Sequence, residues 1–314
     1  MKRQVLFFRD FEQFYGGHLK VWDYFKHVLS SPDHTANIIF SANSIWDQSN
    51  PWIDSRDYVV DSKADISPDI LFVAGVDWLH LEESERDNSS IPIVNLIQHP
   101  QHADPGSLRS EFLRHKAFRI CVSQEIEDVL RASGTPNGPL MTIPLGFDTS
   151  VIPAAKDDAA RTLDVLIAGL KQPEIARQIF DKLAQQALSV QLITEHLPRG
   201  RYLERMAEAR IVVCLPNPRE GFYLPALEAM AAGTVVICPD CVGNRGFCID
   251  SYNCLKPEYS VESIVDSVQN AVMMMSVERE KLQIQARMTT TQHELMVERR
   301  SFLEVLRSID QLWR

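Results

Sequence analysis

The sequence predicts an α/β protein with two domains, each a parallel sheet covered by helices. Short apolar runs rich in β-branched residues alternate with segments of helical spacing, the order expected of strand–helix–strand units. The chain has 314 residues, which is long enough for two domains that each bury a core of their own.

Composition narrows the class of protein. Hydrophobic residues make up 45% of the chain and charged residues 24%, as in ordinary globular proteins. The formal charge of −10 argues against a broad electrostatic grip on nucleic acid or anionic lipid. The N-terminal apolar run is too short for a signal peptide, and no run approaches the ~18–20 residues of a membrane helix. We therefore expect a cytoplasmic protein, with peripheral contact to the inner membrane face left open.

The first half of the chain contains several predicted strands and helices. A buried strand is predicted at 4–8, followed by a loop and then a helix at 21–29. Residues 41–68 are polar and are expected to be rich in loops, and further strands are predicted at 69–75 and 91–98. Polar residues without apolar periodicity follow at 154–162 (AAKDDAART) and predict an interdomain linker.

The second half repeats the pattern. A strand and loop are predicted at 163–171, a helix begins near Pro173, and a strand follows at 189–194. A helix at 199–210 precedes the apolar run 211–215, which is expected to be a buried parallel strand.

The most informative stretch is EGFYLPALEAMAAGTVVIC, residues 220–238. Pro225 stands where a helix should begin and Gly233 where it should end. The run after Gly233 is the next strand, so the stretch completes a strand–loop–helix–strand unit. Glu220 lies in the loop at the carboxyl end of the first strand, where open α/β sheets bind ligands.

This loop has the properties of a diphosphate site. The first N–H groups of the helix lack partners within it and carry the positive end of the helix dipole. Gly221 lets a ligand approach the backbone closely. Glu220 and Glu228 would repel a phosphate, so hydroxyl groups are better partners for them. A nucleotide-sugar supplies such groups at both ends, a hexose at one and a ribose at the other.

Glu220 and Glu228, eight residues apart in this setting, resemble the E-x7-E signature of retaining glycosyltransferases with the GT-B fold, the group 1 or family 4-like enzymes. The resemblance implies two Rossmann-like α/β domains facing across a cleft. It also implies transfer of a sugar from a nucleoside diphosphate to a hydroxyl of a glycan, lipid-linked or small-molecule acceptor, with retention. It implies no metal and no cofactor. The residues expected to bind the donor through the loop are Gly221, Phe222, Tyr223, Leu224 and Pro225.

The resemblance also sets the domain limits. The acceptor-side domain spans 1–153, and the nucleotide-sugar domain spans 163–295. The amphipathic helix at about 296–314 is expected to cross back onto the first domain. Leu145 departs from the family, where asparagine is common.

Cations for the diphosphate are expected on the loop after the first strand of the second domain. Related transferases carry an arginine directly after the glycine and a lysine a few residues on, whereas this chain has Gly169, Leu170 and Lys171, and then Arg177. The cations of this chain therefore stand at other distances from the glycine than in the related transferases. We expect Lys171 to reach the diphosphate and to act with Glu220 in catalysis, while Arg177 fits a solvated helix face equally well.

In the first domain the candidates are glycines and histidines. Gly16 and Gly17 follow the first strand, and the resemblance places their loop near the donor phosphates and the acceptor; a simple turn is the alternative. His99 follows a buried strand and is a candidate for contacting the transferred sugar in catalysis. His18 and His102 are candidates on the acceptor side. Either His99 or His102 could instead be a hydrogen-bonded loop residue.

The stretch after residue 238 leaves two questions open. Asn244 and Arg245 could complete the donor pocket, or the segment could be an ordinary glycine turn. The cysteines of this region could form a zinc or redox site, or they could be buried thiols that pack as small apolar side chains. They are Cys238, Cys241, Cys248 and Cys254.

Three other functions remain open at this point. The same fold supports nucleotide-sugar epimerases and sugar phosphorylases, and a chain of this kind could also be a scaffold without catalysis. The resemblance favours a transferase of glycan, glycoconjugate or polysaccharide biosynthesis.

Overall fold

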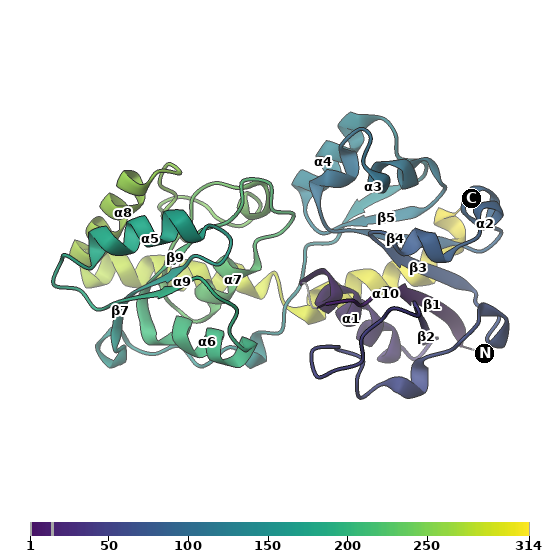
Figure 1. Cartoon of the computed structure of the whole chain (residues 1–314), viewed down its shortest axis with the longest axis horizontal. Coiled ribbons are helices and arrows are strands. Elements are labelled where there is room, and N and C mark those ends of the chain that lie inside the picture. The colour runs from purple at the N-terminus through teal and green to yellow at the C-terminus, as the bar shows by residue number, and fades with distance from the viewer. Residues whose placement is uncertain (1, 14–15, 314) are drawn as a thin grey trace. The chain divides into compact units, whose positions relative to one another are not determined.

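The computed structural model describes residues 2–13 and 16–313, and it divides the chain into two compact units (Figure 1). The first unit comprises Met1–Leu145 and Leu295–Arg314, and the second comprises Gly146–Glu294. The first unit therefore ends at Leu145, whereas the sequence predicted that the first domain extends to residue 153. Residues 146–162 belong with the second unit.

The first unit is built on a six-stranded parallel sheet in the order β2-β1-β3-β4-β5-β6. Strands β3 and β4 are buried along their whole length, as expected of parallel strands covered on both faces. The predicted strands correspond to β1, β3 and β4. The strands are β1 Arg3–Arg9, β2 His34–Phe40, β3 Ile70–Ala74, β4 Ile93–Ile97, β5 Phe118–Cys121 and β6 Leu140–Thr142.

Helices of the first unit include one that begins earlier than predicted. Helix α1 starts at Gly16, so the two glycines are its first residues rather than part of a loop. Glycine is a poor helix former, and tertiary packing compensates: Lys20 of α1 is buried against Glu298 of α10, with Nζ 3.0 Å from Oε2. The helices are α1 Gly16–Leu29, α2 Glu83–Asn88, α3 Leu108–Glu111, α4 Gln124–Ser133 and α10 Leu295–Leu312.

The C-terminal helix α10 belongs to the first unit, as the sequence predicted. Phe302 packs its ring against Tyr24 of α1 and Phe72 of β3, with centroid distances of 4.6 and 5.8 Å. The remote end of the chain thereby completes the core around the first strands.

The second unit has a four-stranded parallel sheet in the order β10-β9-β7-β8. Helices α5 and α8 cover one face and α6 and α7 the other (Figure 1). The strands are β7 Leu163–Ala168, β8 Val190–Ile193, β9 Ala209–Cys214 and β10 Val235–Ile237. The helices are α5 Pro173–Leu183, α6 Arg199–Glu208, α7 Leu224–Ala231, α8 Val261–Met273 and α9 Ser276–Thr291.

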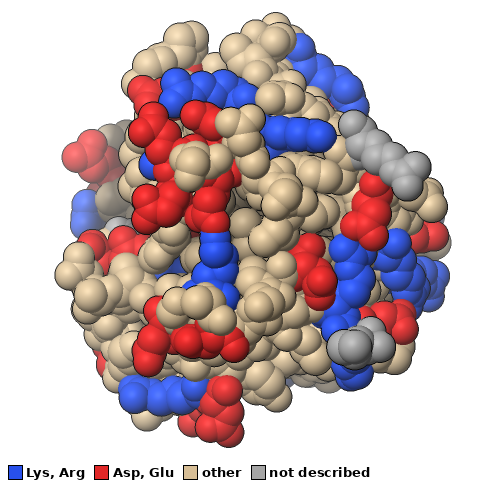
Figure 2. Space-filling view, turned by 90° about the vertical axis from the view of Figure 1, so that its right-hand side faces the viewer, with Lys and Arg blue, Asp and Glu red and all other residues tan. Residues whose placement is uncertain are grey.

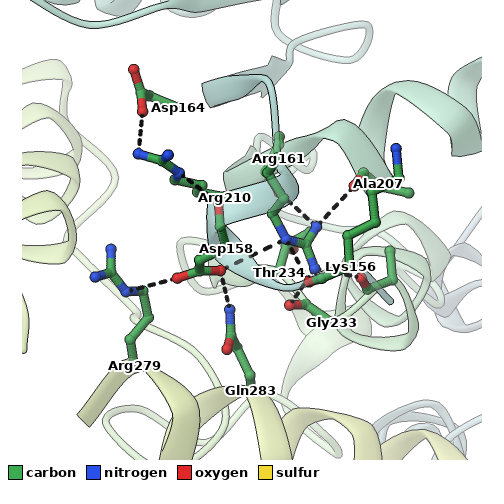
Figure 3. A network of polar contacts seen from close by, with 12 residues as sticks. Lys156, Asp158, Arg161, Asp164, Ala207, Arg210, Gly233, Thr234, Arg279 and Gln283 are labelled. Carbon is green, nitrogen blue, oxygen red and sulfur yellow. Dashed lines mark hydrogen bonds and ion pairs between the residues drawn. The ribbon is translucent and has the colours of Figure 1, made fainter. Parts of the chain in front are cut away.

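The segment predicted as a linker is hydrogen-bonded to the rest of the second unit through Arg161 (Figure 3). Its buried guanidinium donates to the carbonyl oxygens of Ala207 and Ala209 at 3.0 and 2.9 Å, and to those of Ala232 and Gly233 at 3.0 and 2.9 Å. The last two carbonyls stand at the C-terminal end of α7, where helical carbonyls lack partners and a cation is favoured. The polar composition of 154–162 thus reflects a hydrogen-bonded segment.

Charged side chains of both signs are interspersed on the face shown in Figure 2. Side chains of opposite charge also form ion pairs in the first unit. Arg3 lies 2.8 Å from Asp310, and Arg307 lies 3.1 Å from Asp33. Among the described residues, no helix is both long and apolar enough to cross a membrane.

Candidate donor and acceptor sites

Two loops at the carboxyl edge of the second sheet meet through a short polar chain. Lys171 and Gln172 follow β7, and Asn217 and Glu220 follow its neighbour β9. Gln172 donates to Oδ1 of Asn217 at 2.9 Å, and Asn217 donates through Nδ2 to Oε1 of Glu220 at 3.0 Å. Nζ of Lys171 lies 3.6 Å from the same Glu220 oxygen. The structure therefore brings together the lysine and the glutamate that the sequence singled out.

Exposure of this pair suits ligand binding. The Lys171 side chain is 50% exposed and that of Glu220 is 14% exposed. The carboxylate of Glu220 is held in place by Asn217, whereas the Lys171 ammonium group stands on a half-exposed side chain. Arg177, the other candidate cation, is an exposed residue of α5.

Helix α7 begins beside Glu220, one residue earlier than predicted, with Pro225 second in the helix. Fewer amides are free for a ligand than the sequence suggests. Pro225 has no N–H group. The N–H of Tyr223 donates to the Gly243 carbonyl at 2.9 Å, and the N–H of Ala226 donates to the Tyr223 carbonyl at 3.3 Å. The N–H of Leu224 precedes the hydrogen-bond pattern of the helix and can serve an anion.

Gly233 ends this unit as the sequence predicted. Its φ of +71° lies in the left-handed region that favours glycine. Since its carbonyl also accepts from Arg161, both the backbone turn and the buried cation fix the far end of α7.

The loop after β10 supports the Glu220 loop through close backbone contact. A Cβ on Gly243 would lie 2.8 Å from the N and Cα atoms of Phe222 and 2.9 Å from the carbonyl oxygen of Glu220. Only glycine permits this approach. The Phe222 ring packs on Phe247 at 5.2 Å between centroids, and Tyr223 is buried in the core. The side chains of Phe222 and Tyr223 thus anchor the turn that carries Glu220.

Asn244 and Arg245 have different surroundings. Asn244 is fully buried and donates to the Pro239 carbonyl at 2.8 Å, while its Oδ1 accepts from the Cys241 amide at 3.2 Å. Its side chain therefore fixes the shape of its own loop. Arg245 is exposed and pairs with Asp240 at 2.7 Å.

Glu228 points from α7 toward helix α6. Its carboxylate is buried, and Nη2 of Arg199, the first residue of α6, lies 2.6 Å from Oε1. Burial raises the pKa of Glu228, and the charge of Arg199 acts in the opposite direction. Arg199 was not among the residues chosen from the sequence. A helix-starting arginine gives no sign of which neighbouring helix it will contact.

The cysteines are buried and free. Burial raises the pKa of Cys241 to about 12, so its thiol is protonated at neutral pH. Within residues 2–13 and 16–313, no group of three or more His, Cys, Asp and Glu side chains is arranged to hold a metal ion. These findings favour cysteines that pack as small apolar side chains.

In the first unit, the glycines of α1 lie close to the end of β4. Nε2 of Gln98 donates to the Gly17 carbonyl at 3.3 Å. His99, the next residue, accepts from the Gln101 amide through Nδ1 at 3.1 Å and so begins a short turn. The structure therefore brings Gly17 and the His99 loop to the same edge of the sheet, with Gly16 exposed at the start of the helix.

His18 and His102 are both buried. Burial, with a contribution from Arg9, lowers the pKa of His18 to about 4, although Asp10 acts against this. Burial, followed by the charges of Arg109 and His99, lowers the pKa of His102 to about 3. Both imidazoles are therefore neutral at physiological pH.

Strands β1 and β3 meet where the strand order of the first sheet reverses, the position at which such sheets bind ligands. Arg9 ends β1 and Asp77 follows β3, and Nη2 of Arg9 lies 2.8 Å from Oδ1 of Asp77. Burial raises the pKa of Asp77 to about 7, against the effect of Arg9. This pair was not chosen from the sequence, because its members are far apart along the chain.

Known proteins resemble parts of this chain in sequence and nearly the whole chain in fold. Residues 151–288 match the family model of glycosyl transferases group 1. A stretch of 160 residues is 26% identical to the MMP alpha-(1->4)-mannosyltransferase of Mycolicibacterium hassiacum. This match covers 40% of the chain and 39% of the relative, so the chain spans about two fifths of that protein's length.

Solved structures share the fold over nearly the whole chain. A glycosyltransferase from Rickettsia africae has a TM-score of 0.77 at 11% identity, with 99% of each chain covered. Sucrose-phosphate synthase from Thermosynechococcus elongatus has a TM-score of 0.74 at 11% identity, covering 99% of this chain and 100% of that one. HepE from Anabaena in complex with UDP-glucose has a TM-score of 0.71 at 11% identity, covering 97% and 99%. The chain has the GT-B fold.

Proposed function

We propose that this protein is a retaining glycosyltransferase that moves a sugar from a nucleoside-diphosphate sugar to a hydroxyl acceptor in glycan or glycoconjugate assembly. The observation that carries the proposal is the position of Glu220, which Asn217 holds 3.6 Å from Lys171 at the turn leading into α7. The match of the second unit to group 1 glycosyl transferases and the likeness to a mannosyltransferase support it.

The proposed reaction exchanges one bond to the anomeric carbon for another. The acceptor oxygen forms a bond to that carbon, and the bond from the carbon to the β-phosphate oxygen breaks. The departing phosphate takes the acceptor proton, so no residue of the protein serves as nucleophile. Negative charge grows on the diphosphate as the bond breaks, and preorganised donors aimed at it lower the barrier.

Each residue has a defined part in this scheme. Lys171 and the Leu224 amide face the diphosphate and stabilise the developing charge. Glu220 accepts hydrogen bonds from the sugar hydroxyls and sets their orientation, and Glu228 does the same for the ribose. We propose that these groups suffice without a divalent cation, so activity should persist in EDTA.

The Glu220→Gln variant tests the proposal, with donor turnover measured as release of nucleoside diphosphate from UDP-, GDP-, ADP- and dTDP-sugars. Turnover should fall by about 10²-fold or more, while affinity for the nucleoside diphosphate stays within a few fold. Glu204 is exposed on α6 and paired with Arg201, so Glu204→Gln is the matched control. Turnover by Glu220→Gln equal to that of the control would refute the role of Glu220 and favour a scaffold without catalysis.

A further inference from the structure

A cavity of about 570 Å³ opens at the edge of the first sheet where strands β1 and β2 begin. The candidate acceptor-side residues follow the carboxyl ends of the strands, so the cavity lies at the opposite edge of the sheet. Its volume falls within the roughly 300–1,000 Å³ of small-molecule sites. The cavity is lined by Lys2, Arg3, Pro32, Asp33, His34 and Arg307.

Three of the lining side chains are cations, and they come from opposite ends of the chain. Lys2 and Arg3 stand at the start of β1, and Arg307 belongs to the C-terminal helix α10. Lys2 is exposed and donates to the Ser31 carbonyl at 3.5 Å. The side chains of Arg3 and Arg307 are 29% and 53% exposed. Each cation is therefore within reach of a small anion from solvent.

The two arginines have carboxylate partners that are themselves exposed. Nη2 of Arg3 lies 2.8 Å from Oδ1 of Asp310, whose side chain is 64% exposed. Nε of Arg307 lies 3.1 Å from Oδ2 of Asp33, whose side chain is 54% exposed. Ion pairs between exposed side chains contribute roughly 0–1 kcal/mol, so an anion can join or replace a carboxylate at little cost. With Lys2, the group has three cations and two carboxylates and carries a net charge of +1.

His34 forms a buried part of the cavity wall. It is 2% exposed, and its Nδ1 lies 3.0 Å from Oγ of Ser31. Burial, followed by the charge of Arg3, lowers the pKa of His34. Arg307 acts in the same direction and Asp33 in the opposite one. The imidazole is therefore neutral at neutral pH, and the positive charges of both arginines act at this one wall of the cavity.

We propose that this cavity binds a small phosphomonoester that carries hydroxyl groups, such as a phosphorylated sugar. Lys2, Arg3 and Arg307 hold the phosphate, and the carboxylate of Asp33 accepts a hydrogen bond from a hydroxyl. A phosphate brings a charge of about −1.5 to −2 and three strong acceptor oxygens, and the planar guanidinium fork matches its geometry. The ligand joins α10 to the start of β1. This site is separate from the proposed donor site and does not depend on the proposed function.

Titration calorimetry of the full chain with ribose 5-phosphate, inorganic phosphate and ribose tests the inference. Ribose 5-phosphate should bind more tightly than inorganic phosphate, because it adds a hydroxyl for Asp33, and ribose alone should give no measurable heat. Arg307→Met should weaken ribose 5-phosphate by about 10-fold or more, since hydrogen bonds to charged groups are among the strong ones. Arg300 is exposed on the same helix and does not line the cavity, so Arg300→Met is the matched control and should leave the affinity within 2-fold.

A second pair of variants separates this cavity from the proposed donor site. Lys171→Met should leave the affinity for ribose 5-phosphate within 2-fold, whereas Lys2→Met should reduce it by about 3-fold or more. Lys2 is exposed, so its variant provides a test even if Arg307→Met does not fold. Absence of binding, or equal affinity of wild type, Arg307→Met and Lys2→Met, overturns the inference. A loss in Lys171→Met alone also overturns it, because the phosphate would then lie at the donor site. Inorganic phosphate that binds as tightly as ribose 5-phosphate contradicts the assigned ligand class.

Discussion

Lys171 Nζ and Glu220 Oε1 lie 3.6 Å apart, and they reach this distance from loops that follow two neighbouring strands, β7 and β9. The carboxyl ends of parallel strands meet at one edge of a sheet, so the topology of the second unit creates the pairing. Asn217 holds the glutamate while the lysine remains half exposed. A held acceptor beside a half-exposed cation suits a ligand that carries both hydroxyls and phosphates.

Lys171→Met should lower donor turnover by about 10²-fold, because it removes the side-chain cation that faces the leaving diphosphate. The side chain is half exposed, so the free energy of unfolding should change by less than about 0.5 kcal/mol. Steady-state rates of nucleoside diphosphate release and chemical denaturation measure the two quantities. Arg177→Met is the control, and a turnover loss of equal size in both variants would contradict the assignment.

Gly243→Ala should displace the turn that carries Glu220. The added Cβ would meet backbone atoms of Phe222 at 2.8 Å, which cannot move as the end of a flexible side chain can. We expect a loss of about 1–3 kcal/mol in unfolding free energy and at least 10-fold weaker binding of nucleoside diphosphate. A Cβ on Gly200 has no heavy atom within 4 Å, so Gly200→Ala should be harmless to stability. Normal nucleotide binding by Gly243→Ala would show that the loop after β10 does not support the site.

Arg161→Met should destabilise the second unit by about 3 kcal/mol or more, because it leaves several buried carbonyl groups without their donor. Arg161→Lys should rescue little, since three ammonium N–H bonds cannot replace the planar fork. Arg210 belongs to the same network but is 39% exposed, with Nη1 2.9 Å from Asp164, so Arg210→Met should cost clearly less. Urea unfolding of the three variants measures these differences, and equal losses for Arg161 and Arg210 would contradict the account.

His102 should make the protein less stable as the medium becomes acidic. Its pKa is about 3 in the folded protein, chiefly because of burial and then the charges of Arg109, His99 and Arg119, and is about 6.5 when unfolded. Below pH 6.5 the unfolded chain therefore takes up a proton that the folded chain does not, and stability falls as pH falls toward 3. His102 contributes a slope of about 1.4 kcal/mol per pH unit within that window. The unfolding free energy of His102→Gln from pH 7 to pH 4.5 should fall less steeply than that of the wild type, and parallel curves would exclude this contribution.

The fold was predictable where local and tertiary preferences agree. Apolar β-branched runs, with Pro225 and Gly233 at the ends of a helix, predict the unit from β9 to β10 because each residue satisfies a backbone requirement of its own. Strand β2 was not predicted: it lies at the sheet edge and alternates buried with half-buried residues over a partly polar sequence. The early start of α1 was likewise hidden, because packing of Lys20 on Glu298 outweighs the local preference of two glycines.

Some residues of the candidate site are likewise indicated by local sequence patterns, and others are not. Glu220, Glu228 and Lys171 follow from a motif, a helix start and a strand end, all of which are local in sequence. Arg199 depends on how α6 and α7 pack, which no periodicity reveals. Asn244 is the opposite case. Its position in the sequence suggests a residue of the donor pocket, whereas its side chain is fully buried and hydrogen-bonded within its own loop.

The most direct test of the central claim is a thermal shift of the wild-type protein with UDP, GDP, ADP, CMP and dTDP compounds. The account predicts that at least one of them binds at the turn before α7 and, at 100 times its Kd, stabilises the protein by about 2.7 kcal/mol. It also predicts that Lys171→Met weakens this shift. Melting curves that none of these nucleotides moves would contradict the assignment of a nucleotide-sugar site.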